Sequence, residues 1–302
     1  MAERMVVRVV GDDRVSFLHG MCSNDIKNAR PGAIVPALFL TEHAHAIAEF
    51  FAWIGEDSVL IEIDRDGWTR ARAHLEKLLV ADDVEFEDQA ELSVVDIEGP
   101  RAAEAIHSVA KDAAMPDAWR SMCEGELTIG NVPRYGLPAF TILMERTKAS
   151  AAISAIEALG DDFRQVSHAA MDIVRIENGV AEIGVDTTDK TIALEARLNR
   201  DISFDKGCYV GQETIERATA RGGLKKKLFG LRFEGNRMPE IHAMLMFDGK
   251  EVGRLSSAVL SPRFGAIGLA ILHHSAWKPG TRVAVSDSSG EIAATVSDIP
   301  FR

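Results

Sequence analysis

A free cysteine in a short segment bounded by glycines is the residue of this chain best suited to chemistry. The segment reads Lys206-Gly207-Cys208-Tyr209-Val210-Gly211-Gln212-Glu213, and residues 214–220 can form a helix after it. Glycines permit a tight backbone path with unusual dihedral angles. A helix start and a lysine two residues away both favour the thiolate, the form that acts as a nucleophile or a metal ligand. Cys208 and Lys206 are therefore the candidate catalytic residues.

The same cysteine has a simpler interpretation, because free cysteines often serve as small buried apolar side chains in turns. The other two, Cys22 and Cys123, are far away in sequence, and the chain has no CxxC pair. We therefore expect neither a disulfide framework nor a structural zinc site. Three cysteines also cannot hold a four-cysteine iron–sulfur cluster within this chain, and they fit a reducing compartment.

A pair of histidines is a candidate metal site. His43 and His45 alternate along an expected strand and would point to the same side. Two histidines with a third ligand could hold a metal, but such pairs are more often structural. We expect no bound metal.

Length and charge limit the classes of protein to consider. The chain has 302 residues, so two or three domains are expected. A net charge of −12 argues against broad binding to nucleic acid, which requires a surplus of Lys and Arg. No apolar run reaches the roughly 18 residues of a membrane span. No signal or transit segment is evident, so we expect a cytoplasmic protein without membrane contact.

The order of elements predicts an α+β protein with two regions. A strand at 6–10 precedes a short helix that Asp12 or Asp13 can cap, and Asp64 can cap another helix after a hairpin at 44–63. Strands and helices alternate irregularly to about residue 220. From about residue 224, short strands separated by turns, with Asp248-Gly249 as a tight hairpin turn, predict a small antiparallel barrel or sandwich.

The eight-residue string KGCYVGQE at 206–213 resembles the signature of the YgfZ family, relatives of the glycine-cleavage T-protein, an aminomethyltransferase. Other segments resemble family motifs along nearly the whole chain. They are Phe17-Leu18-His19-Gly20 with Ser23-Asn24-Asp25, Arg175-Ile176-Glu177-Asn178-Gly179, Val252-Gly253-Arg254-Leu255-Ser256-Ser257 with Ser261-Pro262, and Ile299-Pro300-Phe301.

This resemblance implies a three-lobed arrangement around a central cavity that binds tetrahydrofolate. Residues 1–223 would form two intertwined α+β lobes, and residues 224–302 an antiparallel β-barrel. It also implies an accessory function in the maturation or repair of iron–sulfur enzymes, which would be the partner proteins, with an effect on tRNA modification through one of them. The alternative is a folate-dependent methyl- or aminomethyltransferase.

Glu177 is the residue that the resemblance assigns to the pterin ring of folate. A carboxylate can accept two parallel hydrogen bonds from the ring NH and the exocyclic amine. A solvated carboxylate near a helix end is the alternative. The other residues carried over as folate-binding are Arg175, Gly207, Tyr209, Gly211, Gln212, Glu213 and Asn24.

Two departures from the family stand out. Asp82 and Asp83 occupy a position where relatives often carry bases. A basic rim would attract the glutamate tail of folate, so acids here disfavour tail binding at this place. The catalytic aspartate segment of the T-protein is also not found around residues 53–64, which disfavours ordinary aminomethyl transfer.

Overall fold

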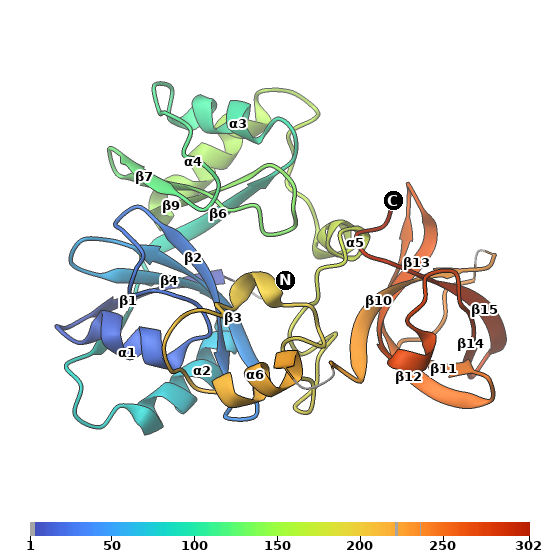
Figure 1. Cartoon of the computed structure of the whole chain (residues 1–302). Helices are drawn as coiled ribbons and strands as arrows, with labels where there is room; N and C mark the ends of the chain where they lie inside the picture. The colour runs from blue at the N-terminus through green and yellow to red at the C-terminus, as the bar shows by residue number, and fades with distance from the viewer. Residues whose placement is uncertain (1–3, 221–222, 236) are drawn as a thin grey trace. The chain divides into compact units, whose positions relative to one another are not determined.

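The computed structural model describes residues 4–220, 223–235 and 237–302, and the chain forms two compact units. Unit 1 consists of Met1–Leu40, Ile47–Val166 and Arg200–Val210, and unit 2 of Thr41–Ala46, Ser167–Asn199 and Gly211–Arg302 (Figure 1). Each unit is thus assembled from separate stretches of chain. Unit 2 contains segments that the sequence prediction grouped with the first 223 residues.

A five-stranded sheet forms the first half of unit 1. Its strand order is β2-β3-β4-β1-β5, with β1 (Arg4–Val10), β2 (Ile34–Leu40), β3 (Ala46–Ile54), β4 (Val59–Asp64) and β5 (Glu85–Asp88). The predicted hairpin is confirmed, since Ile54 of β3 pairs with Val59 of β4. Helices α1 (Arg14–Met21) and α2 (Arg65–Leu78) pack on this sheet through buried side chains such as Leu18 and Leu75.

The two helix caps predicted in this lobe had different outcomes. Asp64 caps α2 as expected, because its carboxylate accepts a hydrogen bond of 2.6 Å from the Gly67 amide. Asp13 precedes α1 but makes no capping bond, and its carboxylate accepts from the Asp83 amide instead. The side-chain cap predicted for α1 is therefore wrong, because a distant loop competes for the carboxylate. Among the described helices, none combines the length and apolar character that crossing a membrane requires.

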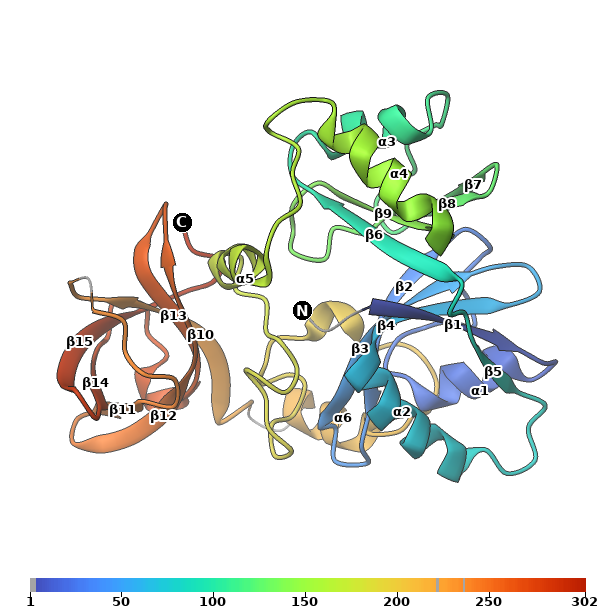
Figure 2. The ribbon, with the colours of Figure 1, turned by 180° about the vertical axis from the view of Figure 1, so that it is seen from behind.

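A four-stranded sheet forms the second half of unit 1. Its order is β6-β9-β8-β7, with β6 (Leu92–Glu98), β7 (Ser121–Glu124), β8 (Leu127–Asn131) and β9 (Ala139–Glu145). Helices α3 (Ala102–Val109) and α4 (Arg146–Glu157) cover one face of it, as Figures 1 and 2 show from opposite sides. A buried cluster with Phe51, Trp53 and Leu143 joins the two sheets. Gly130 is required there, because a Cβ atom would lie 2.4 Å from the Trp53 ring.

A closed barrel dominates unit 2 and confirms the predicted C-terminal barrel. Its order is β10-β13-β12-β11-β14-β15, with β10 (Lys226–Phe233), β11 (Met244–Phe247), β12 (Lys250–Ser261), β13 (Gly265–His273), β14 (Arg282–Asp287) and β15 (Gly290–Ser297). Asp248 and Gly249 link β11 to β12 with φ angles of 49° and 72°. Positive φ at both central residues is the geometry of a tight two-residue hairpin turn.

The remaining elements are two helices and two short 3₁₀ turns. Helix α5 (His168–Glu177) begins at Ser167, whose side chain caps it by accepting from the Ala170 amide. Helix α6 (Gln212–Ala220) follows the Cys208 segment in the sequence. The 3₁₀ turns are η1 (Asn199–Asp201) and η2 (His274–Ala276). Both α5 and α6 belong to unit 2, so the candidate residue Glu177 lies at the end of a unit 2 helix.

Candidate functional site

The segment around Cys208, residues 206–210, is attached at both ends to the C-terminal turn of α1; we call it the Cys208 strap. The Lys206 ammonium donates hydrogen bonds to the main-chain carbonyls of His19, Cys22 and Asn24, at 2.5, 2.8 and 2.8 Å. The Val210 amide donates to the Gly20 carbonyl at 3.1 Å. Cys208 therefore lies between two fixed points.

Cys208 is exposed, whereas Lys206 and Tyr209 of the same strap are buried. Lys206 and Tyr209 are 8% and 9% exposed, and the lysine nitrogen lies 5.0 Å from the centre of the tyrosine ring. The alternative of a cysteine buried in a turn is therefore not what the structure shows. Cys22 fits that description instead, because it is fully buried, and burial raises the pKa of its thiol.

The charge of Lys206 acts on groups of the α1 turn. Burial raises the pKa of Cys22, and Lys206 opposes this shift. Burial lowers the pKa of His19, and Lys206 lowers it further. The influence of Lys206 on the Cys208 thiol stays a prediction. Sequence reasoning missed the three hydrogen bonds from Lys206 to main-chain carbonyls. The sequence does not reveal which helix end a distant lysine reaches.

The glycines of the strap region differ from each other. Gly211 has a φ of +90°, a conformation that favours glycine, while Gly207 is not in that region. Beyond Gly211, the side chains of α6 pair along the helix surface. Gln212 donates to Glu216 at 2.7 Å, and Glu213 forms an ion pair with Arg217. The folate contacts predicted for Gln212 and Glu213 stay predictions.

Asn24 holds its own loop in place. Its amide nitrogen donates to the Pro36 carbonyl at 2.7 Å, and its amide oxygen accepts from the Asp25 amide at 2.9 Å. The neighbouring Ser23 hydroxyl donates to the carbonyl of Asp201 and accepts from the Leu38 amide. These bonds fix the loop whose carbonyls accept hydrogen bonds from Lys206.

Glu177 ends helix α5 in unit 2, and its carboxylate points to the β12–β13 hairpin. The side chain is 9% exposed; it accepts from the Ser261 hydroxyl at 2.6 Å and pairs with Arg263 at 3.4 Å. The Ser261 oxygen in turn accepts from the amides of Arg263 and Phe264. Glu177 is thus not a solvated carboxylate. Since a carboxylate has about four acceptor positions, Glu177 could accept further donors.

Arg175 is buried in a network of its own, in the last turn of α5. It donates to Asp186 at 2.5 Å, to the Ser257 hydroxyl at 3.0 Å and to the Val180 carbonyl at 3.1 Å. Asp186 also accepts from the Ser256 and Ser257 hydroxyls. These bonds tie α5 to strand β12. The cofactor contact predicted for Arg175 stays a prediction, while its protein contacts are structural.

Sequence reasoning missed a buried group of charges in unit 1. Glu62 is fully buried and accepts from Arg4 at 2.5 Å and from Arg134 at 3.0 Å. Arg134 also donates to Asp96 at 2.7 Å. Burial raises the pKa of the nearby Glu98 to about 8, although Arg134 opposes the shift. The signal in the sequence was Glu62 itself, a charge between the apolar Ile61 and Ile63 in the strand Val59–Asp64.

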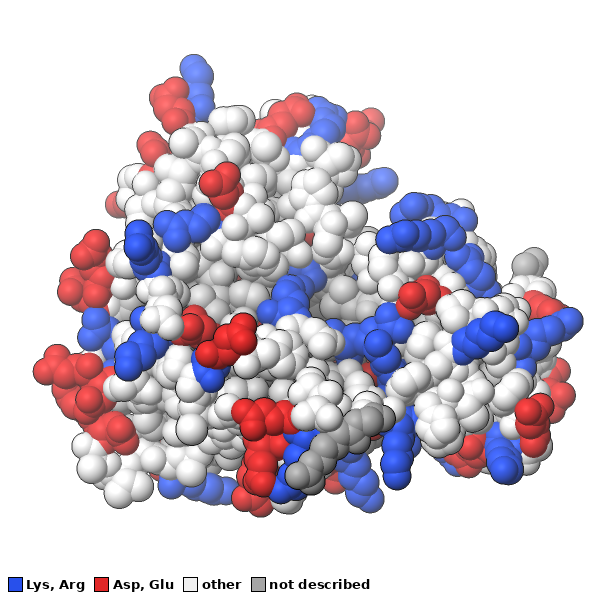
Figure 3. All heavy atoms as spheres, viewed as in Figure 1, with Lys and Arg blue, Asp and Glu red and all other residues white. Residues whose placement is uncertain are grey.

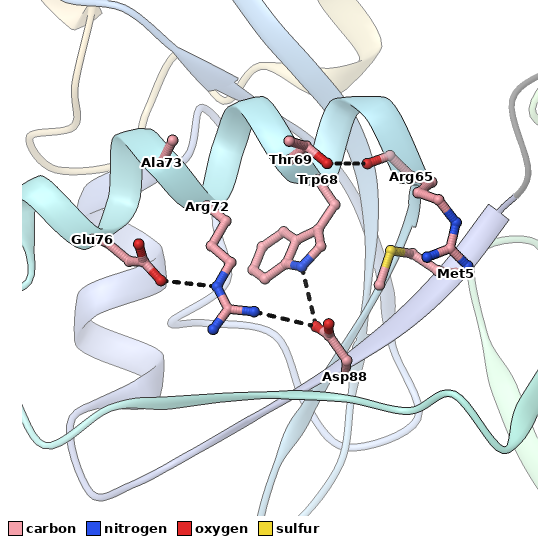
Figure 4. Close-up of a pocket in the computed structure, with 8 residues that line it drawn as sticks. All are labelled: Met5, Arg65, Trp68, Thr69, Arg72, Ala73, Glu76 and Asp88. Carbon is pink, nitrogen blue, oxygen red and sulfur yellow. Dashed lines mark hydrogen bonds and ion pairs between the residues drawn. The ribbon is translucent and has the colours of Figure 1, made fainter.

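A pocket of about 290 Å³ lies along α2, away from every predicted site residue (Figure 4). Its floor is Trp68, whose ring nitrogen donates to Asp88 at 3.2 Å. Arg72 bridges Glu76 and Asp88 at the rim. Arg72, Glu76 and Asp88 therefore satisfy one another at the rim.

Neither the distribution of surface charge nor the placement of potential metal ligands marks a further site among the described residues (Figure 3). Acidic and basic side chains are mixed on the face of each unit in Figure 3. The rings of His43 and His45 lie 5.9 Å apart. Over residues 4–220, 223–235 and 237–302, no three His, Cys, Asp or Glu side chains group in a way that could hold a metal ion.

Comparisons with known proteins agree with the architecture of both units. Residues 3–206 match the family model of the GCVT N-terminal domain, and residues 226–302 match that of the glycine cleavage T-protein C-terminal barrel domain. The chain belongs to the glycine cleavage T-protein family. This confirms the resemblance at the level of the family.

Relatives of this T-protein family member match along almost its whole length. A chloroplastic protein of Arabidopsis thaliana with a provisional transferase name is 26% identical, covering 98% of this chain and 68% of its own. The aminomethyltransferase of Thermosipho melanesiensis is 22% identical, with 98% and 82% covered. The crystal structure of the glycine cleavage system aminomethyltransferase T of Bartonella henselae matches with a TM-score of 0.88 at 21% identity, covering 99% and 84%. The T-protein fold predicted from the sequence is therefore confirmed.

Proposed function

We propose that this T-protein family member belongs to the YgfZ branch, as a cytoplasmic tetrahydrofolate-binding protein that assists the maturation or repair of iron–sulfur enzymes. Its effect on tRNA modification would come through one such enzyme. The observation that carries the proposal is the exposed Cys208, held between two anchors within the KGCYVGQE segment. A thiol presented in this way is accessible to a client protein, and a reachable thiolate can act on sulfur or on a metal.

Glu177 supports the folate part of the proposal. Ser261 and Arg263 fix its carboxylate, which leaves acceptor positions for the ring NH and amine of a pterin. The donor set of the pterin therefore fits this residue. Tetrahydrofolate, when bound, supplies a carrier for one-carbon units. The chain's own part is to bind the pterin at Glu177 and to present Cys208.

Calorimetric titration with tetrahydrofolate tests the binding site. Glu177→Gln keeps the shape of the side chain but removes the charge. We expect its affinity to fall by about 10- to 100-fold, as for the loss of hydrogen bonds to a charged group. Glu91→Gln, on an exposed residue of unit 1, is the matched control and should bind like the native protein. Equal affinity for native protein and Glu177→Gln would refute the assignment.

The role of Cys208 is tested in cells that lack the native copy, by measuring the activities of iron–sulfur enzymes. Cys208→Ala should fail to restore them. Cys123→Ala changes the other exposed cysteine and should restore them fully. Full restoration by Cys208→Ala would end the proposed role of the thiol.

A folate-dependent methyl- or aminomethyltransferase is the second candidate. It is favoured by the similarity to named aminomethyltransferases over nearly the whole chain. In that case the purified protein should convert a methyl or aminomethyl donor with tetrahydrofolate as acceptor. Cys208→Ala should then keep this turnover. Absence of turnover with such donors would leave the accessory function as the better explanation.

A further inference from the structure

The ammonium group of Lys206 is fully occupied by the protein backbone. A lysine has three N–H donors, and three carbonyls receive them, those of His19, Cys22 and Asn24. The side chain is 8% exposed, so these bonds replace its hydration. A cation bound in this way is fixed in position and in direction.

One of the three carbonyls, that of His19, belongs to the last turn of α1, where the helix cannot satisfy it. Helix α1 ends at Met21, and the last four carbonyls of a helix lack partners within it. The Lys206 ammonium donates a hydrogen bond to the His19 carbonyl, and the Val210 amide donates one to the Gly20 carbonyl. A cation is also favourable at the negative end of the helix dipole. The Cys208 strap therefore caps the C-terminus of α1.

We propose that Lys206 is the positioning residue of Cys208, acting by clamping the strap onto α1 rather than by its charge on the thiol. This inference rests on the proposed function of Cys208. The two anchors, Lys206 and Val210, are four residues apart, and a span this short has few conformations when both ends are bound. Tyr209 packs inward beside the lysine, so Cys208 is left facing outward.

The geometry also requires a lysine in particular. Its compact ammonium directs three donors to carbonyls that surround one point, whereas the planar fork of arginine suits two parallel acceptors. Lys206→Arg should therefore behave like Lys206→Met, although it keeps the positive charge. An influence of charge on the thiol would instead be retained in Lys206→Arg.

Two measurements on the full chain separate these possibilities. The first is amide hydrogen exchange at residues 207–211, which should be about tenfold faster or more in both variants, as expected for the loss of a hydrogen bond to a charged group. The second is the rate of Cys208 alkylation by iodoacetamide against pH, read by mass spectrometry with Cys123 as internal control. The pH of half-maximal rate should be the same in native protein, Lys206→Met and Lys206→Arg.

Val210→Pro provides a variant without any change of charge. It removes the other anchor, the amide that binds Gly20, and should speed exchange in the strap in the same way. In the cell assay, all three strap variants should restore iron–sulfur enzyme activities as poorly as Cys208→Ala.

Two results would overturn the proposal. One is an alkaline shift of the alkylation profile in Lys206→Met that Lys206→Arg does not show. The other is unchanged exchange of the strap in both lysine variants. If exchange responds as expected but Cys208→Ala is fully active in cells, the proposed function fails while the clamp remains.

Discussion

Two buried cations lie close in sequence to the two candidate residues, and they are held in different ways. Lys206, near Cys208, is bound by three main-chain carbonyls. Arg175, near Glu177, is bound by the carboxylates of Asp172, Glu182 and Asp186, by the Ser257 hydroxyl and by one carbonyl. The first anchor depends on a single side chain, because the carbonyls are always present. The second is shared among several side chains, each of which can be removed separately.

The two anchors also differ in what remains after a loss. Without Lys206, the carbonyls of His19, Cys22 and Asn24 lose their donor. Water can hydrate them where the strap opens. Without Asp186, which is its buried carboxylate partner, Arg175 would keep only the partly exposed carboxylates of Asp172 and Glu182. Removing the buried partner of a buried charge is costly. We therefore expect the carboxylate network to matter more for the free energy of unfolding, and the lysine to matter more for the strap.

Asp186→Ala should have the largest effect. It leaves Arg175 without its main partner and removes the acceptor of two serine hydroxyls, so the free energy of unfolding should fall by about 3–5 kcal/mol. Urea unfolding measures this loss. Asp189→Ala, on an exposed residue nearby in sequence, should change stability by no more than about 0.5 kcal/mol. A loss below about 1 kcal/mol for Asp186→Ala would contradict the expectation that the carboxylate network matters more than Lys206 for the free energy of unfolding.

Lys206→Met should cost less, about 1–3 kcal/mol, because it removes hydrogen bonds from a charged donor but leaves no unpaired charge behind. The same urea titration applies. Lys27→Met removes an exposed lysine from unit 1 and should have little effect. If Lys206→Met proves as damaging as Asp186→Ala, the distinction between the two anchors is lost.

A third buried cation, Arg134, extends the comparison to pH. Burial raises the pKa of its neighbour Glu98 from 4.5 to about 8. The folded state therefore binds a proton that the unfolded state releases, so stability falls as pH rises from about 4.5 to about 8. Glu98→Gln cannot lose this proton. It should become more stable than native protein as pH rises, by on the order of 2 kcal/mol at pH 6 and more at pH 8. Parallel pH curves for the two proteins would show that Glu98 does not carry the effect.

Ser257→Ala should have the smallest effect, about 1–2 kcal/mol, because it removes two hydrogen bonds, one to Asp186 and one from Arg175. Asp186 keeps Arg175, Ser256 and the Glu182 amide as donors after this change. The midpoint of urea unfolding should shift slightly without a change in slope. A loss as large as that of Asp186→Ala would mean that the network is not shared among its members.

The sequence predicted features that depend on neighbouring residues. Asp64 and Gly67 are three residues apart, and the Asp248-Gly249 turn is set by its own dihedral angles. The barrel and the α+β sheets followed from such local patterns and from family motifs. The cap at Asp13 failed because Asp83, 70 residues away, competes for the same carboxylate.

The sequence proposed residues for the candidate site but gave no information on their contacts. Cys208 and Glu177 were identified from their motifs, and the structure shows the first exposed and the second buried. The carbonyls that hold Lys206 lie more than 180 residues from it in sequence. Such pairings are set by tertiary packing, so the spacing of residues within a motif cannot reveal them.

The different burial of the three cysteines offers a practical tool. Cys22 is sealed in the core, while Cys123 and Cys208 are exposed. Replacing Cys123 by serine would therefore leave Cys208 as the one exposed thiol, without altering the strap. A photo-crosslinker or a fluorescent label attached at that single atom would report which proteins approach it.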